Sequence, residues 1–511
     1  MYKVRVLQEI DDRLDAEYYN PAALSTLKKM ENKGTVTTFG SLVNEGYRVV
    51  YHGTDSISGL KDSEVLPFLS PTQIDPNGAI SFDDADKLPL YYMERYPKGL
   101  AKAGEILVEV KGNVSKVGIV PLDFPKNLMI SGSLYKATLD PKRADSHYVL
   151  AFLKSRHGQI LKNRLTSNTI INYIAKDALY SIPVIEFGEK AQKYIGDKVR
   201  QAEQLRAWAK RCRGKINDYF DGLFTGISLT KPEHHHTRVS LDILVPRLNA
   251  EYYSDHYTQV EKGLLDRFGK LTTLGRLAPT VRAKTKPSAD CTYKEIGDLD
   301  VGKGAFSSGT FYKYGEAPNN AQRIFDEGDV AVSTRRPNRG AVAVIEESSS
   351  TTFYSVFLAR LKPKNKNFGY WLKEFLRHDA GKLLLLQRCT WTTYPVISED
   401  DIETIPVPEI PNDWDFVARL SRQSVELEAF ATNLTTSAKT LVEVLIEGQL
   451  TEQQLIQAQQ ALEDGDNGLD QAILGKLSNE GYAIEGSTPL FSDLDELYRL
   501  LESSAQAGAE A

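Results

Sequence analysis

Two segments of the chain carry apolar residues at alternating intervals of three and four, the spacing that places them on one side of a helix. The pattern runs from Ile195 to Leu223 in the first segment and from Val417 to Leu445 in the second, and neither segment contains proline. Each pattern continues through about four heptads, which is typical of a coiled-coil seam. We therefore predict two long helices, each at least roughly 43 Å long at the usual helical rise.

We expect these helices to pack against each other as an antiparallel pair, because a lone helix of this length would expose its apolar stripe. The alternative is an amphipathic helix that packs only on its own domain. The predicted seam consists of Ile195, Ala202, Leu205, Ile216 and Tyr219 in the first helix and of Leu420, Leu427, Leu434 and Leu441 in the second. The same two lines also pass through Lys198, Ala209, Cys212 and Leu223, and through Val417, Ser424, Ala431, Ala438 and Leu445.

The residues before each long helix have a different pattern. Residues 104–120 contain short apolar stretches interrupted by Gly, Asn and Lys, as strands joined by turns do, and residues 328–345 repeat this pattern. Helical stretches are expected at 148–158 and 370–381. We predict a mixed α/β (α+β) domain in front of each long helix.

These similarities belong to an internal duplication of one unit of about 220 residues. Residues 13–19 recur as residues 247–253 with six of seven positions identical, and further blocks follow in the same order. We infer six segments: a domain at 1–185, a helix at 186–224, a linker at 225–239, a second domain at 240–411, a second helix at 412–448 and a tail at 449–511. The further matched blocks are 37–40 with 272–275, 104–106 with 328–330, 182–184 with 405–407, and 200–209 with 422–431.

Charge is distributed unevenly along the chain. The net charge is −6, but residues 449–511 alone carry −10, which leaves +4 on residues 1–448. The body of the protein is therefore mildly basic, which permits nucleic-acid binding without requiring it. In the acidic tail we expect helices near 453–462 and 494–501 and no stable structure at 503–511, and we expect its removal to leave recognition intact.

Cysteine usage and hydropathy suggest the compartment. Three cysteines, Cys212, Cys291 and Cys389, are too few for a disulfide framework, and we expect a cytoplasmic protein with buried thiols. No apolar run is long enough to cross a bilayer, and the N-terminus lacks the apolar core of a signal peptide. Three adjacent histidines at 234–236 lie in a polar connector without further ligands nearby, so we expect no metal site.

Motifs for covalent chemistry are absent. The sequence has no Walker phosphate loop, no dinucleotide fingerprint after a strand and no nucleophile elbow. An amino-methyltransferase would need an Asn/Asp-Pro-Pro-aromatic segment, and the chain contains no Pro-Pro pair.

One segment leaves a nuclease open. Glu109 and Lys111, with the acidic residues at 83, 84 and 86 upstream, provide carboxylates and a lysine of the kind that bind Mg²⁺ and activate water. The second copy has Ser333 and Arg335 at the matching positions, so the carboxylate is not repeated whereas the positive charge is. A repeated basic residue fits phosphate contact better than metal catalysis.

Two polar, basic loops recur at equal spacing in both copies, at 111–116 and 164–172 and again at 335–339 and 388–394. Lys and Arg neutralise phosphates, Arg binds guanine through two hydrogen bonds, and Asn does the same for adenine. The loop residues differ between copies while the scaffold residues match, as expected if each copy reads a different sequence. The candidate DNA-binding residues are Lys111, Asn113, Lys116, Arg164, Asn168, Thr169 and Asn172 in the first copy and Arg335, Arg336, Asn338, Arg339, Arg388, Thr392, Thr393 and Tyr394 in the second.

In these features the sequence resembles the specificity (S) subunit of Type I restriction–modification enzymes. The tandem domains, the strand starts at 104–107 and 328–331, the Ile-Pro-Val segments at Ile182 and Ile405, and the heptad helices carry the likeness, over roughly residues 10–448. Glu105 stands where that family usually has Asp, and the acidic tail lies outside the family pattern.

The resemblance implies two target-recognition domains, each reading one half of a bipartite double-stranded DNA target. It implies that the paired helices set the distance between the halves and dock two methyltransferase (M) subunits, which bind S-adenosylmethionine, while restriction/translocase (R) subunits cleave DNA. It also implies no catalysis and no cofactor in this chain. Two alternatives stay open: a Mg-dependent DNA nuclease using Glu109 and Lys111, and an interaction scaffold with no DNA role.

Overall fold

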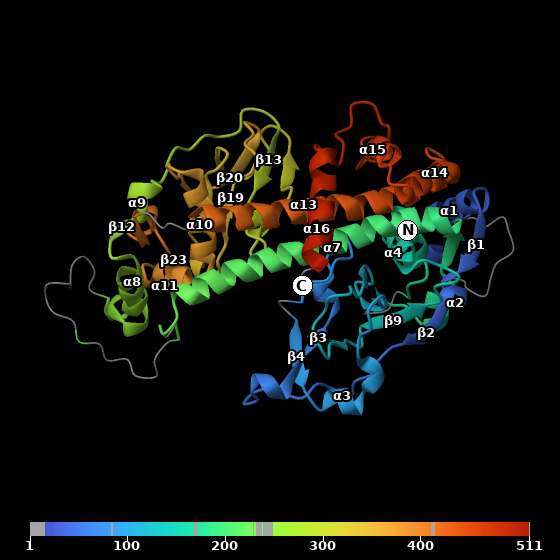
Figure 1. The fold of residues 1–511 in the computed structure, drawn as a ribbon, viewed down its shortest axis with the longest axis horizontal. Helices are drawn as coiled ribbons and strands as arrows, with labels where there is room; N and C mark the ends of the chain where they lie inside the picture. The colour runs from blue at the N-terminus through green and yellow to red at the C-terminus, as the bar shows by residue number, and fades with distance from the viewer. Residues whose placement is uncertain are drawn as a thin grey trace. The chain divides into compact units, whose positions relative to one another are not determined.

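The structure, a computed structural model of the chain, describes residues 16–82, 85–167, 172–227, 229, 230, 238, 249–391, 393–409 and 414–509. The chain forms two compact units, unit 1 (residues 1–208 and 427–511) and unit 2 (residues 209–426). Both boundaries fall inside long helices, α7 (Glu189–Leu223) and α13 (Trp414–Glu447), drawn in green and orange in Figure 1. Each unit therefore contains a mixed α/β domain together with part of both helices.

A four-stranded antiparallel sheet lies at the centre of unit 1, in the order β2 (Val43–Tyr47), β9 (Leu134–Leu139), β5 (Ile106–Glu109) and β7 (Val117–Ile119). Every residue of β5 is buried, because packed layers cover both of its faces. A second sheet has the order β4 (Asp86–Pro89), β3 (Val65–Leu69) and β8 (Met129–Ile130). Buried residues of the two sheets, such as Leu69, Leu107 and Ile130, share one core cluster.

Helices complete this domain. α1 (Pro21–Glu31) begins after Asn20, whose side chain accepts a hydrogen bond from the backbone of Ala22, and Asp145 caps α4 (Ser146–Lys154) in the same way. α5 (Arg156–Asn163) follows α4 after a sharp turn. At Gly158, near the start of α5, a Cβ atom would lie 2.0 Å from the carbonyl oxygen of Phe152, so only glycine allows the close approach.

Unit 2 repeats these elements. β18 (Val330–Ser333) pairs with β19 (Val342–Val344) and β21 (Leu358–Leu361), as β5 pairs with β7 and β9. α8 (Asp255–Phe268), α10 (Lys366–Arg377) and α11 (Asp379–Gln387) follow the positions of α1, α4 and α5 in chain order. Gly381 repeats the close approach, with its Cβ position 2.0 Å from the Phe375 carbonyl oxygen. A four-stranded sheet adds β16 (Thr310–Tyr312), β13 (Cys291–Lys294), β20 (Thr352–Ser355) and β17 (Ala321–Arg323).

The sequence blocks that recur are the ones that contact each other within each unit. In unit 1, β1 (Thr35–Thr38) pairs with β11 (Pro183–Glu186), with Thr37 opposite Val184. In unit 2, β12 (Leu271–Thr273) pairs with β24 (Pro406–Pro408), with Thr272 opposite Val407. The prediction of a mixed fold with tandem repeated domains and long helices is therefore confirmed.

The acidic residue of each strand start has one structural role in both units. Glu105 is 2% exposed, accepts a hydrogen bond from the backbone of Lys102 and pairs with Lys136 at 2.9 Å. Asp329 is equally buried, accepts from the backbone of Asp326 and pairs with Arg360. The ion pair spans neighbouring strands and the backbone bond closes the preceding turn, so Glu and Asp serve equally at this position.

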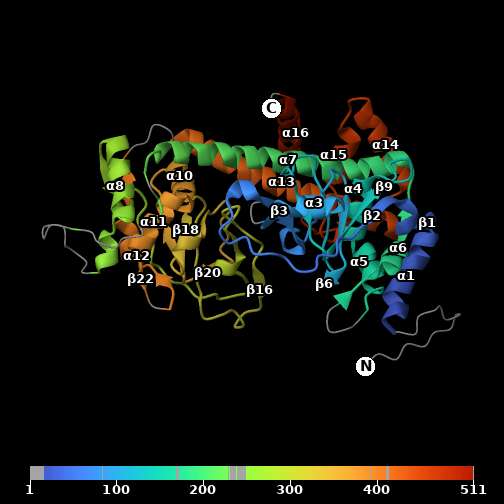
Figure 2. The ribbon, with the colours of Figure 1, turned by 90° about the horizontal axis from the view of Figure 1, so that it is seen from below.

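The long helices contact each other in antiparallel orientation within each unit (Figures 1 and 2). In unit 1, Arg206 of α7 donates to Thr435 of α13 at 2.8 Å. In unit 2, Cys212 lies 3.6 Å from Gln423, and the ring of Tyr219 lies 6.4 Å from that of Phe416. From Arg206 to Cys212 to Tyr219 along α7, the partner residue in α13 falls from Thr435 to Gln423 to Phe416, so the two helices run in opposite directions. The 35 residues of α7 correspond to roughly 52 Å of helix.

The seam residues are buried with two exceptions near the end of α7. Tyr219 and Leu223 are half-buried, whereas their neighbours Phe220 and Phe224 are 1% and 4% exposed. Phe220 packs on Trp371 of α10. Phe224 stacks on His378, the residue that follows the last residue of α10. The inward side of α7 is therefore displaced by one residue here, because α10 supplies a second packing partner. The buried seam residues are Ile195, Lys198, Ala202, Leu205, Ala209, Cys212 and Ile216, and Val417, Leu420, Ser424, Leu427, Ala431, Leu434, Ala438, Leu441 and Leu445.

The acidic tail belongs to unit 1 and is folded. It consists of α14 (Glu452–Glu463), α15 (Gly468–Leu474), a hairpin of β25 (Leu477–Ser478) and β26 (Gly481–Tyr482), and α16 (Leu494–Ala509). The expectation of an unstructured end from residue 503 is wrong, since α16 continues to Ala509.

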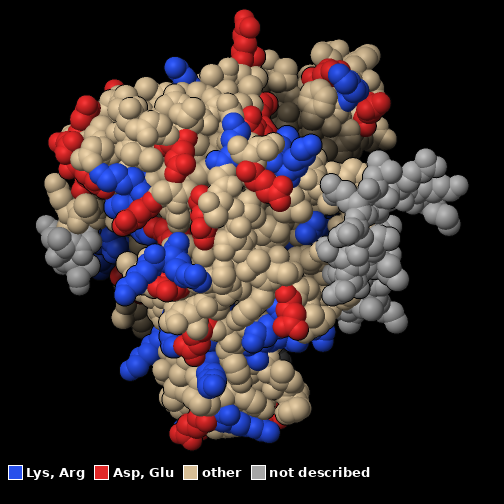
Figure 3. Space-filling view, turned by 90° about the vertical axis from the view of Figure 1, so that its right-hand side faces the viewer, with Lys and Arg blue, Asp and Glu red and all other residues tan. Residues whose placement is uncertain are grey.

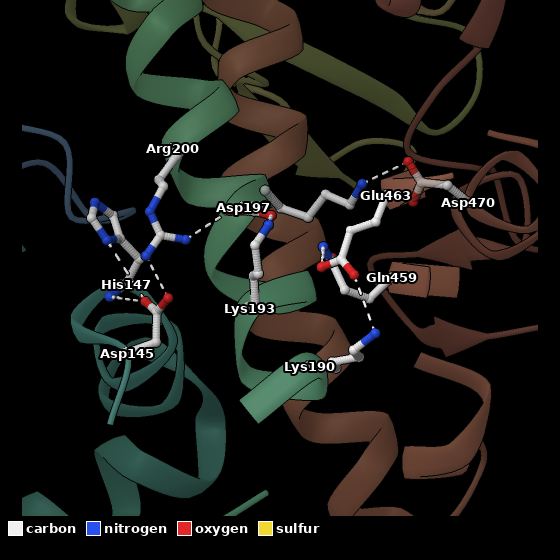
Figure 4. A network of polar contacts seen from close by, with 10 residues as sticks. Asp145, His147, Lys190, Lys193, Asp197, Arg200, Gln459, Glu463 and Asp470 are labelled. Carbon is white, nitrogen blue, oxygen red and sulfur yellow. Dashed lines mark hydrogen bonds and ion pairs between the residues drawn. The ribbon is translucent and has the colours of Figure 1, made fainter. Parts of the chain in front are cut away.

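The tail packs on both long helices. Asp470 is 1% exposed and accepts hydrogen bonds from Lys198 and Tyr194 of α7, at 2.7 and 2.5 Å, and from Tyr498 of α16. Figure 4 shows Asp470 together with Lys190 and Glu463, which form an ion pair at 3.2 Å. Removal of the tail would therefore leave the buried Lys198 ammonium without its counter-charge. That recognition survives this removal stays a prediction.

Candidate nucleic-acid interface

The two basic loops of each copy meet where the central strand ends. In unit 1, β6 (Lys111–Gly112) follows β5 and pairs with β10 (Asn172–Tyr173), with Lys111 opposite Tyr173. In unit 2, Arg335 follows β18 and forms a bridge with Val396 of β23 (Pro395–Val396). β23 in turn pairs with β22 (Thr390–Trp391). Loops that lie about 50 residues apart along the chain thus form one surface in each domain.

Glu109 organises the loop that carries Lys111. Its carboxylate is 5% exposed and accepts hydrogen bonds from the backbone of Asn113, Ser115 and Lys116, at 3.2, 2.9 and 3.1 Å. Gly112 has a φ of 118°, and a Cβ there would lie 2.8 Å from a Glu109 oxygen. The carboxylate is therefore used to hold the backbone of the loop.

The second copy uses a shorter side chain at the same place. The Ser333 hydroxyl donates to the carbonyl oxygen of Arg335 at 2.7 Å. Within the part of the chain that the structure describes, no group of three or more His, Cys, Asp or Glu is placed to hold a metal ion. The geometry at Glu109 and Ser333 thus fits loop positioning in both copies.

Lys162 supports the same loop of unit 1 from inside. It is fully buried on α5 and donates to the carbonyl oxygen of Val114, a residue with a positive φ of 56°. Burial, with a smaller contribution from Lys154, lowers the pKa of Lys162 to about 7. The loop is therefore fixed by a carboxylate and an amine, neither of which faces solvent.

Most candidate residues of the first copy lie on this surface. Lys111, Asn113 and Asn172 are exposed, and Lys116 is half-buried, with its amine donating to the carbonyl oxygen of Ile74 at 2.7 Å. Asn168 and Thr169 lie outside the described residues.

The second copy presents more positive charge. Arg336, Asn338, Arg339 and Thr393 are exposed, and the Arg336 guanidinium lies 5.1 Å from the ring centre of the half-buried Tyr394. Arg335 is half-buried, and Thr392 lies outside the described residues.

Two candidate arginines occupy a different environment. Arg164 is 8% exposed and lies 4.6 Å from the ring centre of Tyr18, and Arg388 is 3% exposed and lies 5.9 Å from that of Tyr252. Arg388 also donates to the Thr404 hydroxyl at 3.0 Å. Both arginines and both tyrosines belong to repeated positions, so this contact is part of the scaffold. We leave Arg164 and Arg388 out of the DNA contacts proposed below.

Each domain contains a pocket beside this surface that the sequence did not indicate. The pocket in unit 1 has a volume of about 320 Å³ and is lined by Tyr47, Arg48, Tyr135, Tyr173 and Lys176 among others. The pocket in unit 2 has a volume of about 440 Å³, and its lining includes Lys284, Arg323, Thr334, Arg335, Phe357 and Glu399. Volumes of this size are within the range of ligand pockets. The only sequence signal was the recurrence of the neighbouring loops.

Charge on the surface is mixed. On the face drawn in Figure 3, basic and acidic side chains are interspersed and form no single basic patch. All three cysteines are buried. No helix among the described residues has both the length and the apolar content needed to cross a membrane.

Comparison of the sequence with protein-family models and with curated proteins found no match. Several solved structures are similar to the chain, including the following three. A Type I restriction–modification S subunit from M. genitalium is 17% identical, with 83% of this chain and 95% of that chain covered and a TM-score of 0.37. The HsdS subunit from Thermoanaerobacter tengcongensis is 12% identical, with 82% and 97% covered and a TM-score of 0.27.

The third structure concerns complex assembly and conformational transition of the type I R-M system. It is 13% identical, with 83% of this chain and 97% of that chain covered and a TM-score of 0.26.

Proposed function

We propose that the chain is the sequence-specific DNA-recognition subunit of a Type I restriction–modification complex. Residues 1–185 and 240–411 are its two target-recognition domains, and each reads one half of a bipartite target. One observation carries this proposal: two copies of one scaffold bring the same pair of loops together with different polar side chains. A structural role alone gives no reason for the loops to differ while their supports are repeated.

The exposed side chains of these loops suit duplex DNA. Lys111, Arg336 and Arg339 are long cations that reach phosphate oxygens without reading sequence. Asn113 and Asn338 are exposed amides of the type that bind adenine through two hydrogen bonds in the major groove. Each loop pair thus combines positioning contacts with groups able to discriminate bases.

The chain itself contributes no covalent step in this proposal. Glu109, the carboxylate that a nuclease would need, is engaged by three backbone N–H groups. Methyl transfer belongs to two M subunits, which bind S-adenosylmethionine, and cleavage to R subunits. The antiparallel α7 and α13 serve as the spacer between half-sites and as a docking surface, and the complex acts in the cytoplasm.

The proposal is tested by measuring duplex binding of the full chain with its M subunits over a range of salt concentrations. We expect tight binding only to duplexes with two separated sequence blocks, and an affinity that falls steeply as salt rises, because phosphate contacts release counterions. The double variant Lys111→Ala, Arg336→Ala should bind more weakly at all sequences. The matched control, Lys28→Ala with Arg267→Ala, removes exposed cations near the ends of α1 and α8 and should bind as the wild type does.

The same preparation separates the alternatives. Salt-insensitive or absent duplex binding would favour the scaffold without a DNA role. Mg²⁺-dependent cleavage by the chain alone, lost in Glu109→Ala, would favour the nuclease.

A further inference from the structure

The two pockets occupy equivalent places in the duplicated fold. In unit 1 the backbone N–H of Val110 donates to the carbonyl oxygen of Ser133 at 2.9 Å. The N–H of Ile174 donates to the carbonyl oxygen of Val110, also at 2.9 Å. In unit 2 the backbone N–H of Thr334 donates to the carbonyl oxygen of Phe357 at 2.9 Å. The N–H of Ile397 donates to the carbonyl oxygen of Thr334 at 3.1 Å. Val110 and Ile174 line one pocket, and Thr334 and Ile397 line the other. The duplication has therefore kept the floor of the pocket.

The walls of the two pockets differ in side chain but share one arrangement. In unit 1 the guanidinium of Arg48 lies 5.3 Å from the ring centre of Tyr173. In unit 2 the guanidinium of Arg335 lies 4.7 Å from the ring centre of Phe357. All four residues line their pockets, yet the arginines come from different places, since Lys111 occupies the position of Arg335 in the first copy. Each pocket thus contains an arginine stacked on an aromatic wall.

Stacking orients a guanidinium and leaves its edge available. The Arg48 Nε donates to the carbonyl oxygen of Gly132 at 2.6 Å and Nη1 donates to the Tyr173 hydroxyl at 3.1 Å. The second N–H of Nη1 and both N–H groups of Nη2 donate to none of the described residues, and Arg48 lines the pocket. The Arg335 guanidinium donates to none of the residues that the structure describes, although this side chain is half-buried. A half-buried guanidinium with unused N–H groups is prepared to bind an acceptor supplied by a ligand.

On the basis of the proposed function, we propose that Arg48 and Arg335 are specificity-determining residues that each bind a guanine in their own half-site. Guanine presents two acceptors, O6 and N7, side by side in the major groove, and the guanidinium fork matches this pair. Each fork is held by an aromatic ring and lies next to the loop pair that contacts the phosphates. Arg48 was not among the candidates that the loop pattern indicated, because it precedes those loops by more than 60 residues.

The charge around the two pockets differs, which supports a different base preference in each half-site. Lys176 lines the pocket of unit 1, and the matching position in unit 2 is Glu399, which pairs with Arg323. A carboxylate beside the fork disfavours phosphate approach and accepts from cytosine N4, whereas a lysine attracts phosphate. Base reading is therefore expected to be stricter in unit 2.

The test uses the full chain with its M subunits and a library of duplexes in which single positions are randomised. Arg335→Lys and Arg48→Lys keep the charge but remove the fork. Each variant should lose its preference for guanine at one position of one half-site, by roughly 5- to 150-fold, and keep the preference at all other positions. Arg422→Lys and Arg95→Lys are matched controls, since both arginines also lie over a tyrosine ring but line neither of the two pockets, and both should keep every preference.

The outcomes are distinguishable. A wild type without sequence preference would overturn the proposed function and this assignment together. A selective wild type whose Arg335→Lys and Arg48→Lys variants keep all preferences would overturn this assignment alone. Equal weakening on every sequence, with no loss of preference at any position, would identify both side chains as phosphate contacts and also overturn it. Thermal unfolding of each variant, expected to match the wild type, excludes loss of folding as the cause.

Discussion

The two recognition domains share their supports and differ in what they present. Glu105 and Asp329 hold the same turn and pair with a cation on the neighbouring strand in each domain. The pocket walls carry Tyr173 and Lys176 in one domain and Val396 and Glu399 in the other. The duplication has thus preserved packing and backbone hydrogen bonds and varied the solvent-facing side chains. Fold and recognition can therefore change independently in this chain.

The long helices show the same contrast in their interior. Lys198 of α7 and Leu420 of α13 occupy equivalent seam positions, and both are buried. Leu420 is apolar and needs no counter-charge. Lys198 is neutralised by Asp470 of the tail, for which the second copy has no equivalent. The tail therefore compensates for a difference between the copies.

The largest effect is expected from Asp470→Ala. This change leaves Lys198 buried without its partner, and breaking a buried ion pair in this way costs about 3–5 kcal/mol. Urea unfolding followed by circular dichroism measures the loss. The double variant Lys198→Leu, Asp470→Leu imitates the second copy and should recover most of the stability; a double variant as unstable as Asp470→Ala would show that the pair is not the cause.

Acid should affect unit 2 through Glu374, whose counterpart in the first copy is Ala151. Burial raises the pKa of Glu374, but Lys373 and Arg377 outweigh it and bring the pKa to about 2. A folded pKa below the unfolded value near 4.5 means that this stabilisation is complete above pH 4.5 and is lost as the pH falls towards 2. The loss amounts to about 3 kcal/mol.

Tryptophan fluorescence, to which the buried Trp371 on the same helix contributes, follows this loss during urea unfolding at several pH values. Between pH 4.5 and 2, the free energy of unfolding of Glu374→Gln should fall by about 3 kcal/mol less than that of the wild type. An unchanged pH dependence would contradict the assignment to Glu374.

A smaller effect is expected at the strand ends. Glu109→Ala removes the acceptor of three backbone N–H groups and should lower the free energy of unfolding by about 2–3 kcal/mol, because bonds to charged groups are the stronger ones. Ser333→Ala, the matched change in the second copy, should cost about 1 kcal/mol. DNA binding should weaken more in Glu109→Ala than in Ser333→Ala. Equal effects in the two copies would contradict the role given to the carboxylate.

The smallest effect is expected from Lys176→Ala at the edge of the first pocket. This lysine is exposed, and loss of one phosphate contact should lower the slope of log affinity against log salt by about 0.9 without changing base preference. Binding titrations at four salt concentrations measure the slope, with Lys28→Ala as the control. A changed base preference would assign Lys176 to base reading instead.

The sequence predicted the architecture because the duplication repeats short blocks that contact one another. Thr37 and Val184 recur as Thr272 and Val407, and both pairs face each other across two strands. The heptad pattern likewise identified the buried side of α13 over its whole length. It failed at Phe220 and Phe224, because their partners Trp371, Phe375 and His378 lie about 150 residues away and impose a different face.

Polar partners that lie far apart in the sequence account for the remaining differences between the predictions from the sequence and the structure. Lys198 follows the seam pattern, but only the fold reveals Asp470, 272 residues further along the chain, as its partner. Arg164 and Arg388 belonged to basic loops by sequence, yet each stacks on a tyrosine more than 100 residues away. A signal for this contact did exist, since the tyrosines and the arginines are each repeated in both copies.

The central claim is that each copy reads its own half of the target. It is tested most directly by exchanging residues 240–411 for those of a related chain and mapping the methylated sequences in cells that express the hybrid with its M subunits. The account predicts that one half of the target changes while the other half and the spacer stay the same. A change in both halves, or in neither, would contradict it.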